Sequence, residues 1–88
     1  MALDSERLEQ LRATRPNVVG HNLVARAIEL ARVTQIEVAQ ATRLPQPYVS
    51  DVARNRYRTI TVENASKFAR FFGCSIEDLF PSCEAVAS

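Results

Sequence analysis

Apolar residues recur at helical spacing along much of the chain, and this pattern predicts an all-α protein. Over residues 22–32, Leu23 and Leu30 fall on one face of a helix, as a core-facing side requires. A second long helix is predicted over residues 62–72, with a core-facing stripe that comprises Val62, Ala65, Phe68, Ala69 and Phe72. No segment alternates apolar and polar residues for long enough to predict a strand.

Capping residues and prolines divide the rest of the sequence into shorter helices. Thr34 caps a helix over residues 35–42, which ends before Pro45 because the residue preceding a proline avoids the helical region. Another helix begins between Pro45 and Pro47 and runs to about Arg54. Other helix starts are expected at the capping residues Asp4 or Ser5, Asn22, Thr61 and Ser75, and Gly73 is expected to close the helix over 62–72. We therefore expect about five or six helices.

The same pattern suggests three parts of the chain. We expect an N-terminal extension with a short helix at residues 1–21, a helical domain at 22–81 and a flexible tail at 82–88. A length of 88 residues fits a single domain. A domain of this size already has a small hydrophobic core, and dividing the chain into two domains would make each core smaller still.

The composition argues against several classes of protein. No run of about 18 apolar residues is present, so no membrane-spanning segment or membrane partner is predicted. The first twelve residues carry acids and lack the apolar segment of a secretory signal, so we expect a cytoplasmic protein. The two cysteines, Cys74 and Cys83, do not make a disulfide framework, and the single histidine, His21, suggests no metal-ligand set. We expect no metal and no cofactor.

The net charge of +1 is unevenly distributed along the sequence. Residues 43–58 have a local balance of +3, from Arg43, Arg54, Arg56 and Arg58 against Asp51. Residues 74–88 have a balance of −3, from Glu77, Asp78 and Glu84. Ten of the eleven basic residues are arginines, which suit bidentate contacts with phosphate or guanine better than lysines do. A genomic bias toward arginine is the alternative explanation.

The most informative feature is the pair of short helices at residues 35–42 and 46–54. Two short helices joined by a tight connection form a corner, and Ala39 is small enough to lie inside it. The wedge between the helices is expected to be filled by Leu44, Val49 and Val52. The outer face of the second helix is then free to enter the major groove of DNA, which is wide enough for one helix.

Three motifs around this corner resemble a known family. They are T-Q-x-x-V-A at 34–39, L-P-Q-P-x-V-S at 44–50, and T-V-E-N-A-x-x-F-A-x-F-F-G-C-S-I-E-D-L-F at 61–80. In this order and at these spacings, residues 23–80 resemble the lambda-repressor-like, or Cro/CI-type, helix-turn-helix proteins, also called the XRE family. The resemblance implies a five- to six-helix domain that binds double-stranded DNA.

The resemblance also implies roles for individual residues. Base edges are expected to be read by Gln46, Pro47 and Asp51, with Tyr48 and Ser50 on the same helix as further candidates. Phosphate contacts are expected from Gln35, Arg43, Arg54, Arg56, Tyr57 and Arg58. Chemistry supports part of this assignment, because glutamine pairs with adenine, aspartate accepts from cytosine and arginine gains from counterion release. For Tyr48, a half-buried position with the hydroxyl in water is the alternative.

The sequence departs from the family pattern at Arg43. The family usually has glycine there, four residues after the small residue that is Ala39 in this chain. If the backbone is left-handed at this position, a non-glycine residue costs roughly 1–2 kcal/mol. We expect an unusual backbone angle at Thr42 or Arg43, and a phosphate contact by Arg43 would compensate for it.

Three functions follow from these observations. The first is a sequence-specific transcriptional regulator, a repressor that binds a palindromic operator as a homodimer. The second is an antitoxin that neutralises a toxin protein and represses its own operon, because residues 46–58 also resemble some HigA-type antitoxins. The third, an enzyme, is disfavoured because no nucleophile–base pair, metal set or phosphate loop is present. Candidates for the dimer surface are Phe71, Phe72, Ile76, Phe80 and the N-terminal helix.

Overall fold

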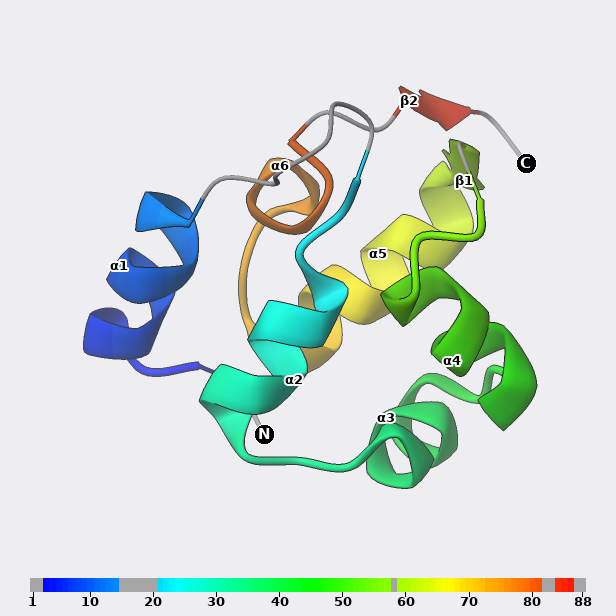
Figure 1. Ribbon diagram of the computed structural model, residues 1–88, viewed down its shortest axis with the longest axis horizontal. Coiled ribbons are helices and arrows are strands. Elements are labelled where there is room, and N and C mark those ends of the chain that lie inside the picture. The colour runs from blue at the N-terminus through cyan, green and yellow to red at the C-terminus, as the bar shows by residue number, and fades with distance from the viewer. Residues whose placement is uncertain (1–2, 15–20, 58, 82–83, 87–88) are drawn as a thin grey trace.

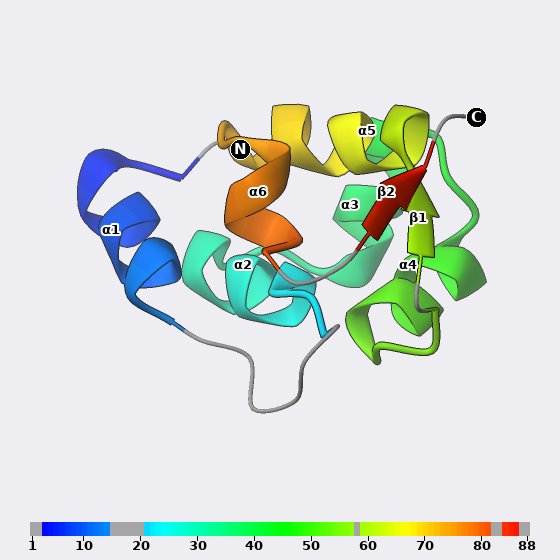
Figure 2. The same cartoon turned by 90° about the horizontal axis from the view of Figure 1, so that it is seen from above.

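The computed structural model describes residues 3–14, 21–57, 59–81 and 84–86, and these residues form six helices and two short strands. The helices are α1 (Ser5–Ala13), α2 (Val24–Ala31), α3 (Gln35–Thr42), α4 (Gln46–Ala53), α5 (Val62–Phe72) and α6 (Ile76–Leu79). The strands are β1 (Thr59–Thr61) and β2 (Glu84–Val86). Helix α1 lies at one end of the molecule and α4 at the other, with α2 and α5 between them (Figures 1 and 2). The predicted helical fold class is confirmed.

Side-chain caps begin the helices much as the sequence predicts. Backbone N–H groups in the first turns donate to the side chains of Asp4, Thr34, Thr61 and Ser75. Capping boxes are complete at the starts of α3 and α6. Helix α2 differs, because its N-cap position is Leu23; Asn22 lies one residue earlier, and its Oδ1 accepts from the Val24 N–H at 2.9 Å. The asparagine therefore still satisfies a free N–H at this helix start.

Three helices end on a residue with left-handed backbone angles. Gly73 closes α5 with φ 71°, as predicted. Arg43 closes α3 with φ 60°, which confirms the unusual angle expected at this turn. Arg32 closes α2 in the same way with φ 57°, which was not predicted. Each arginine therefore occupies a conformation that glycine adopts at lower steric cost.

The hydrophobic core is centred on α5, whose Phe68 and Phe72 are completely buried. The other large side chains with less than 2% exposure come from five different helices and are Leu11, Val24, Val38, Val49 and Leu79. Because these side chains meet in a single cluster, all six helices share one core. None of the described helices is long and apolar enough to cross a membrane.

Helix α1 packs against this same core. Leu3 and Leu11 are both buried in it, and the Leu3 N–H donates to the Phe72 carbonyl oxygen at 2.8 Å. The Arg12 guanidinium joins the other end of α1 to Asp78 of α6, with 3.1 Å between Nε and Oδ1. Leu3 is thus attached to the C-terminal end of α5, and the last turn of α1 is attached to α6.

Two expectations about apolar side chains are wrong. Val62, predicted to lie in the core stripe of α5, is the first helical residue and remains 43% exposed. Phe72 and Phe80, expected on a dimer surface, are buried. The Leu3 N–H bonds to the Phe72 carbonyl oxygen at the end of α5, and the Phe80 ring packs edge-on against Phe68, with 6.2 Å between ring centroids. Phe71 and Ile76, also candidates for that surface, are half-buried and pack against the core.

The two strands were not predicted. Strand β1 pairs with β2 in parallel, and Ile60 lies opposite Ala85. Three-residue strands are too short to show alternation, and their pairing joins segments that are distant in the sequence. A flexible tail was expected over residues 82–88, but residues 84–86 are paired, while 82, 83, 87 and 88 lie outside the described residues.

Candidate nucleic-acid interface

Helices α3 and α4 form the predicted corner. The chain turns between them at Arg43, the C-cap of α3, whose left-handed angles end the helix at Thr42. Pro45 is the N-cap of α4, and Pro47 lies in its first turn, where a missing N–H costs no helical hydrogen bond. Ala39 is buried inside the corner, as expected.

Helix α4 has one buried side and one outward side. Its buried residues are Val49, Val52 and Ala53, as the pattern predicted. On the outward side Gln46 and Pro47 are exposed, and Ser50 and Asp51 are half-buried. Four of the five candidate base-reading side chains therefore lie on a surface that a ligand can reach.

Tyr48, the fifth candidate, makes contacts within the molecule. Its hydroxyl oxygen accepts a hydrogen bond from Asn64 Nδ2 of α5 at 3.1 Å. Its ring lies against that of Tyr57, with ring centroids 5.4 Å apart. Tyr48 is half-buried, and it connects α4 both to α5 and to the segment that follows α4.

Asp51 and Arg56, which were given different roles, form an ion pair. The distance between Arg56 Nε and Asp51 Oδ1 is 3.3 Å, and the Arg56 N–H also donates to the Asp51 carbonyl oxygen at 3.0 Å. The Arg56 side chain remains 61% exposed, so it is accessible to an anion while it is paired. The pair lies where the outward side of α4 meets the segment after the helix.

The other candidate phosphate contacts surround α4. Within the described residues, Arg43 and Arg54 are exposed and form no ion pair with a carboxylate. Gln35, the first residue of α3, is half-buried, and Tyr57 is 44% exposed.

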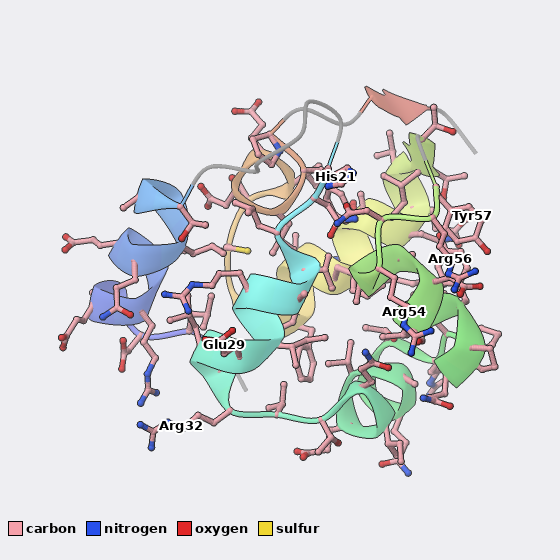
Figure 3. All side chains as sticks on the ribbon, viewed as in Figure 1. His21, Glu29, Arg32, Arg54, Arg56 and Tyr57 are labelled. Carbon is pink, nitrogen blue, oxygen red and sulfur yellow. The ribbon has the colours of Figure 1, made fainter. Side chains whose placement is uncertain are left out.

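Arg54, Arg56 and Tyr57 lie close together beside the end of α4, whereas Glu29 and Arg32 lie at the far end of α2 (Figure 3). Arg58 lies outside the described residues.

Comparison with known protein families identifies this arrangement. A family model described as helix-turn-helix matches residues 24–79, which are well over half of the chain. The protein belongs to this helix-turn-helix family. The curated proteins and the solved structures that were compared with the chain gave no match.

As a member of the XRE-type helix-turn-helix family, the protein is a DNA-binding transcriptional regulator. Helices α3 and α4 are the two helices of the motif, and α4 is the one whose outward side is free to enter a major groove. The match ends at residue 79 and begins at residue 24, so α1 and β2 lie outside the matched span.

Two asparagines behind this surface were not recognised from the sequence as part of it. Asn55 follows α4 with φ 61°, and its Oδ1 accepts from the Asn22 backbone N–H at 2.6 Å. The Asn22 side chain in turn donates from Nδ2 to the Val52 carbonyl oxygen at 2.8 Å. Asparagine tolerates left-handed angles, and this preference could have predicted the turn at Asn55 from the sequence. The hydrogen bond to Asn22, 33 positions away, could not be predicted from the sequence.

The groups with shifted pKa values lie between α1 and α6, away from α4. Burial acts to raise the pKa of Asp78, but hydrogen bonds from Arg12 and Ser75 outweigh it and lower that pKa. The hydrogen bond between Arg12 and Asp78 also raises the pKa of Arg12. Burial raises the pKa of the Cys74 thiol to about 11, with a smaller contribution from Asp78. No group of three or more histidine, cysteine, aspartate or glutamate side chains suited to a metal ion occurs among the described residues.

Proposed function

We propose that this regulator is a sequence-specific repressor that binds a palindromic operator as a homodimer. The observation that carries the proposal is the outward side of α4. There Gln46 is exposed, and two arginines without carboxylate partners among the described residues, Arg43 and Arg54, lie nearby. As part of the same proposal, the protein acts in the cytoplasm.

We assign base recognition to the outward side of α4. Gln46 at the first helical position suits a bidentate pair with adenine. Pro47 offers an apolar contact for a thymine methyl group, and Ser50 offers a hydroxyl. Asp51 has an acceptor for cytosine, although Arg56 already pairs with Asp51 Oδ1 and would compete with the cytosine amino group for that oxygen. Tyr48 supports the helix from behind through Asn64 and Tyr57.

We assign phosphate contacts to residues on both sides of the recognition helix. They are Gln35 and Arg43, which precede the helix, and Arg54, Arg56 and Tyr57, which follow it, together with Arg58, which lies outside the described residues. Each arginine that neutralises a phosphate releases condensed counterions, so affinity falls steeply as salt rises. Because one such domain covers a small area of DNA, a symmetric dimer on two half-sites about 34 Å apart supplies the affinity of a repressor.

Selection of bound DNA from a random pool tests this proposal directly. We expect a palindromic consensus with half-sites separated by about one helical turn. Enrichment of a single half-site would contradict the dimer, and no enrichment would contradict sequence-specific binding. Repression is tested by placing the selected site upstream of a reporter gene, whose output should fall when the protein is expressed.

Variants at the interface test the individual assignments. The double substitution Arg54→Ala and Arg56→Ala should weaken binding to every DNA sequence and reduce the salt slope by about one for each phosphate that is no longer neutralised. Gln46→Ala should retain nonspecific binding but relax base preference at one or two positions in each half-site. Arg7→Ala in α1 is the control, since it removes one positive charge at the opposite end of the molecule (Figure 2).

The antitoxin remains the second candidate. It is favoured by the resemblance of residues 46–58 to HigA-type antitoxins, and α1 lies outside the matched family span and offers an exposed outer side. Expression together with neighbouring reading frames should then yield a stable complex with a small basic protein. Loss of that complex in a variant with substitutions on the exposed side of α1, with DNA binding intact, would support this function. If the protein is purified from such co-expression without a bound partner, the antitoxin function is contradicted.

A further inference from the structure

We propose that Asn22 and Asn55 act together as positioning residues for the DNA contacts of α4 and residues 54–57. We name the hydrogen bonds that join Asn22 and Asn55 to each other and to α4 the asparagine clamp. The inference rests on the proposed function, because it presumes that Arg54, Arg56 and Tyr57 face phosphates.

Asn55 sets the direction in which the chain leaves α4. Its φ of 61° reverses the chain directly after Arg54, and its N–H donates to the Val52 carbonyl oxygen at 3.0 Å. The side chain then points to the segment before α2, where Oδ1 accepts from the Asn22 N–H at 2.6 Å. A glycine at position 55 would permit the same turn but would have no acceptor to hold it.

Asn22 holds the end of the recognition helix from the opposite side. Only 8% of this residue is exposed, and both ends of its amide are bonded. Nδ2 donates to the Val52 carbonyl oxygen in the last turn of α4, while Oδ1 accepts from the Val24 N–H at the start of α2. One buried side chain therefore ties α4 to α2, and leaving these buried polar atoms unpaired would destabilise the contact.

The segment after α4 is also held from its outer side. The Tyr57 ring lies on the Tyr48 ring, and both the backbone and the side chain of Arg56 bond to Asp51. Arg54 lies between these attachments and has an exposed side chain. The backbone on either side of the exposed arginine is thus fixed before DNA arrives, and less conformational entropy is lost on binding.

The substitution Asn55→Gly tests the clamp without breaking the turn. Glycine adopts a φ of 61° without steric cost, so the fold is retained, while the acceptor for the Asn22 N–H is removed. We expect affinity for the selected operator to fall about five- to tenfold, the effect of one lost hydrogen bond. The backbone amide of Asn22 should also exchange faster with deuterated water, whereas amides within α5 keep their protection.

Arg32→Gly is the matched control, because it places glycine at another left-handed position, at the end of α2. It should leave the exchange of the Asn22 amide unchanged and lower operator affinity by less than about twofold. A second variant, Asn22→Ala, should lose at least as much operator affinity as Asn55→Gly, measured at a temperature where circular dichroism shows it folded.

Two results would overturn the clamp. One is Asn55→Gly with wild-type operator affinity despite faster exchange at Asn22, because the bond would then not position the contacts. The other is unchanged exchange at Asn22, because the bond would then be absent in solution. The proposed interface fails separately, if the double substitution Arg54→Ala and Arg56→Ala leaves affinity unchanged.

Discussion

At the scale of single residues, left-handed backbone positions link stability to function. Arg32, Arg43 and Asn55 have φ between 57° and 61°, and of these residues asparagine tolerates the region best. Strained residues of this kind persist where the surrounding structure holds them, and they concentrate at functional sites. Arg43 lies at the turn of the helix-turn-helix motif, whereas Arg32 lies beside Glu29 and α1.

Glycine substitutions separate strain from function at these two arginines. Arg43→Gly and Arg32→Gly should each raise the free energy of unfolding by about 1 kcal/mol, because the left-handed conformation no longer involves a Cβ clash. Urea denaturation measures this gain. Of the two, only Arg43→Gly should weaken DNA binding, by about threefold to tenfold at low salt, because it removes the proposed phosphate contact. Equal affinities of the two variants would argue against a DNA contact by Arg43.

At the scale of elements, the contact between α1 and α6 depends on the charge of one carboxylate. Asp78 accepts hydrogen bonds from Arg12 and also completes the capping box of α6 with Ser75. Its pKa is lower in the folded protein than in the unfolded chain. Its contribution to stability is therefore complete above the unfolded pKa of about 3.9 and is lost as the pH falls through the lower folded value.

The substitution Asp78→Asn should remove this pH dependence. At pH 7 the variant should unfold at lower urea, with a loss of about 0.5–1 kcal/mol, because one partly exposed ion pair and part of one cap are gone. The difference from the wild type should shrink as the pH falls below about 4. Glu77→Gln, at the exposed neighbouring carboxylate, is the control and should follow the wild-type curve. A constant difference down to pH 2 would show that Asp78 acts without its charge.

At the scale of the whole molecule, the folded unit is larger than the part that matches the family. Residues 24–79 carry the motif, but Leu3 and Leu11 from outside this span are buried in the same core. Helix α1 covers the end of α5 that contains Phe72, and this cover is the reason why the aromatic residues there are not a dimer surface. The dimer contact of the proposed repressor is therefore expected elsewhere.

Truncation of Leu11 measures how far α1 belongs to the cooperative unit. This side chain is completely buried, so Leu11→Ala should lower the free energy of unfolding by about 2–5 kcal/mol. Leu8→Ala, at a half-buried position on the same helix, should lose clearly less. Urea denaturation followed by circular dichroism distinguishes the two. If Leu11→Ala had the same urea midpoint as the wild type, α1 would not belong to the unit that unfolds cooperatively.

Most of the helical architecture was predictable because its signals are local. Caps such as Thr34 and Ser75 act within three residues, and prolines at 45 and 47 act on their immediate neighbours. The unusual turn at Arg43 was also predicted, through the family resemblance. The strand pair was not, because β1 and β2 carry no alternation and meet from distant parts of the chain.

The fold class, the helix-turn-helix segment and the candidate side chains on α4 were predictable from the amino-acid sequence, since helical periodicity and caps are properties of neighbouring residues. The packing of the helices was needed to show which of these side chains already have partners within the protein. Tyr48 is bonded to Asn64, Asp51 is paired with Arg56, and Asn55 is bonded to the backbone of Asn22. The hydrogen bond of Tyr48 with Asn64 and that of Asn55 with Asn22 each join separate elements, so they form only once the helices have packed.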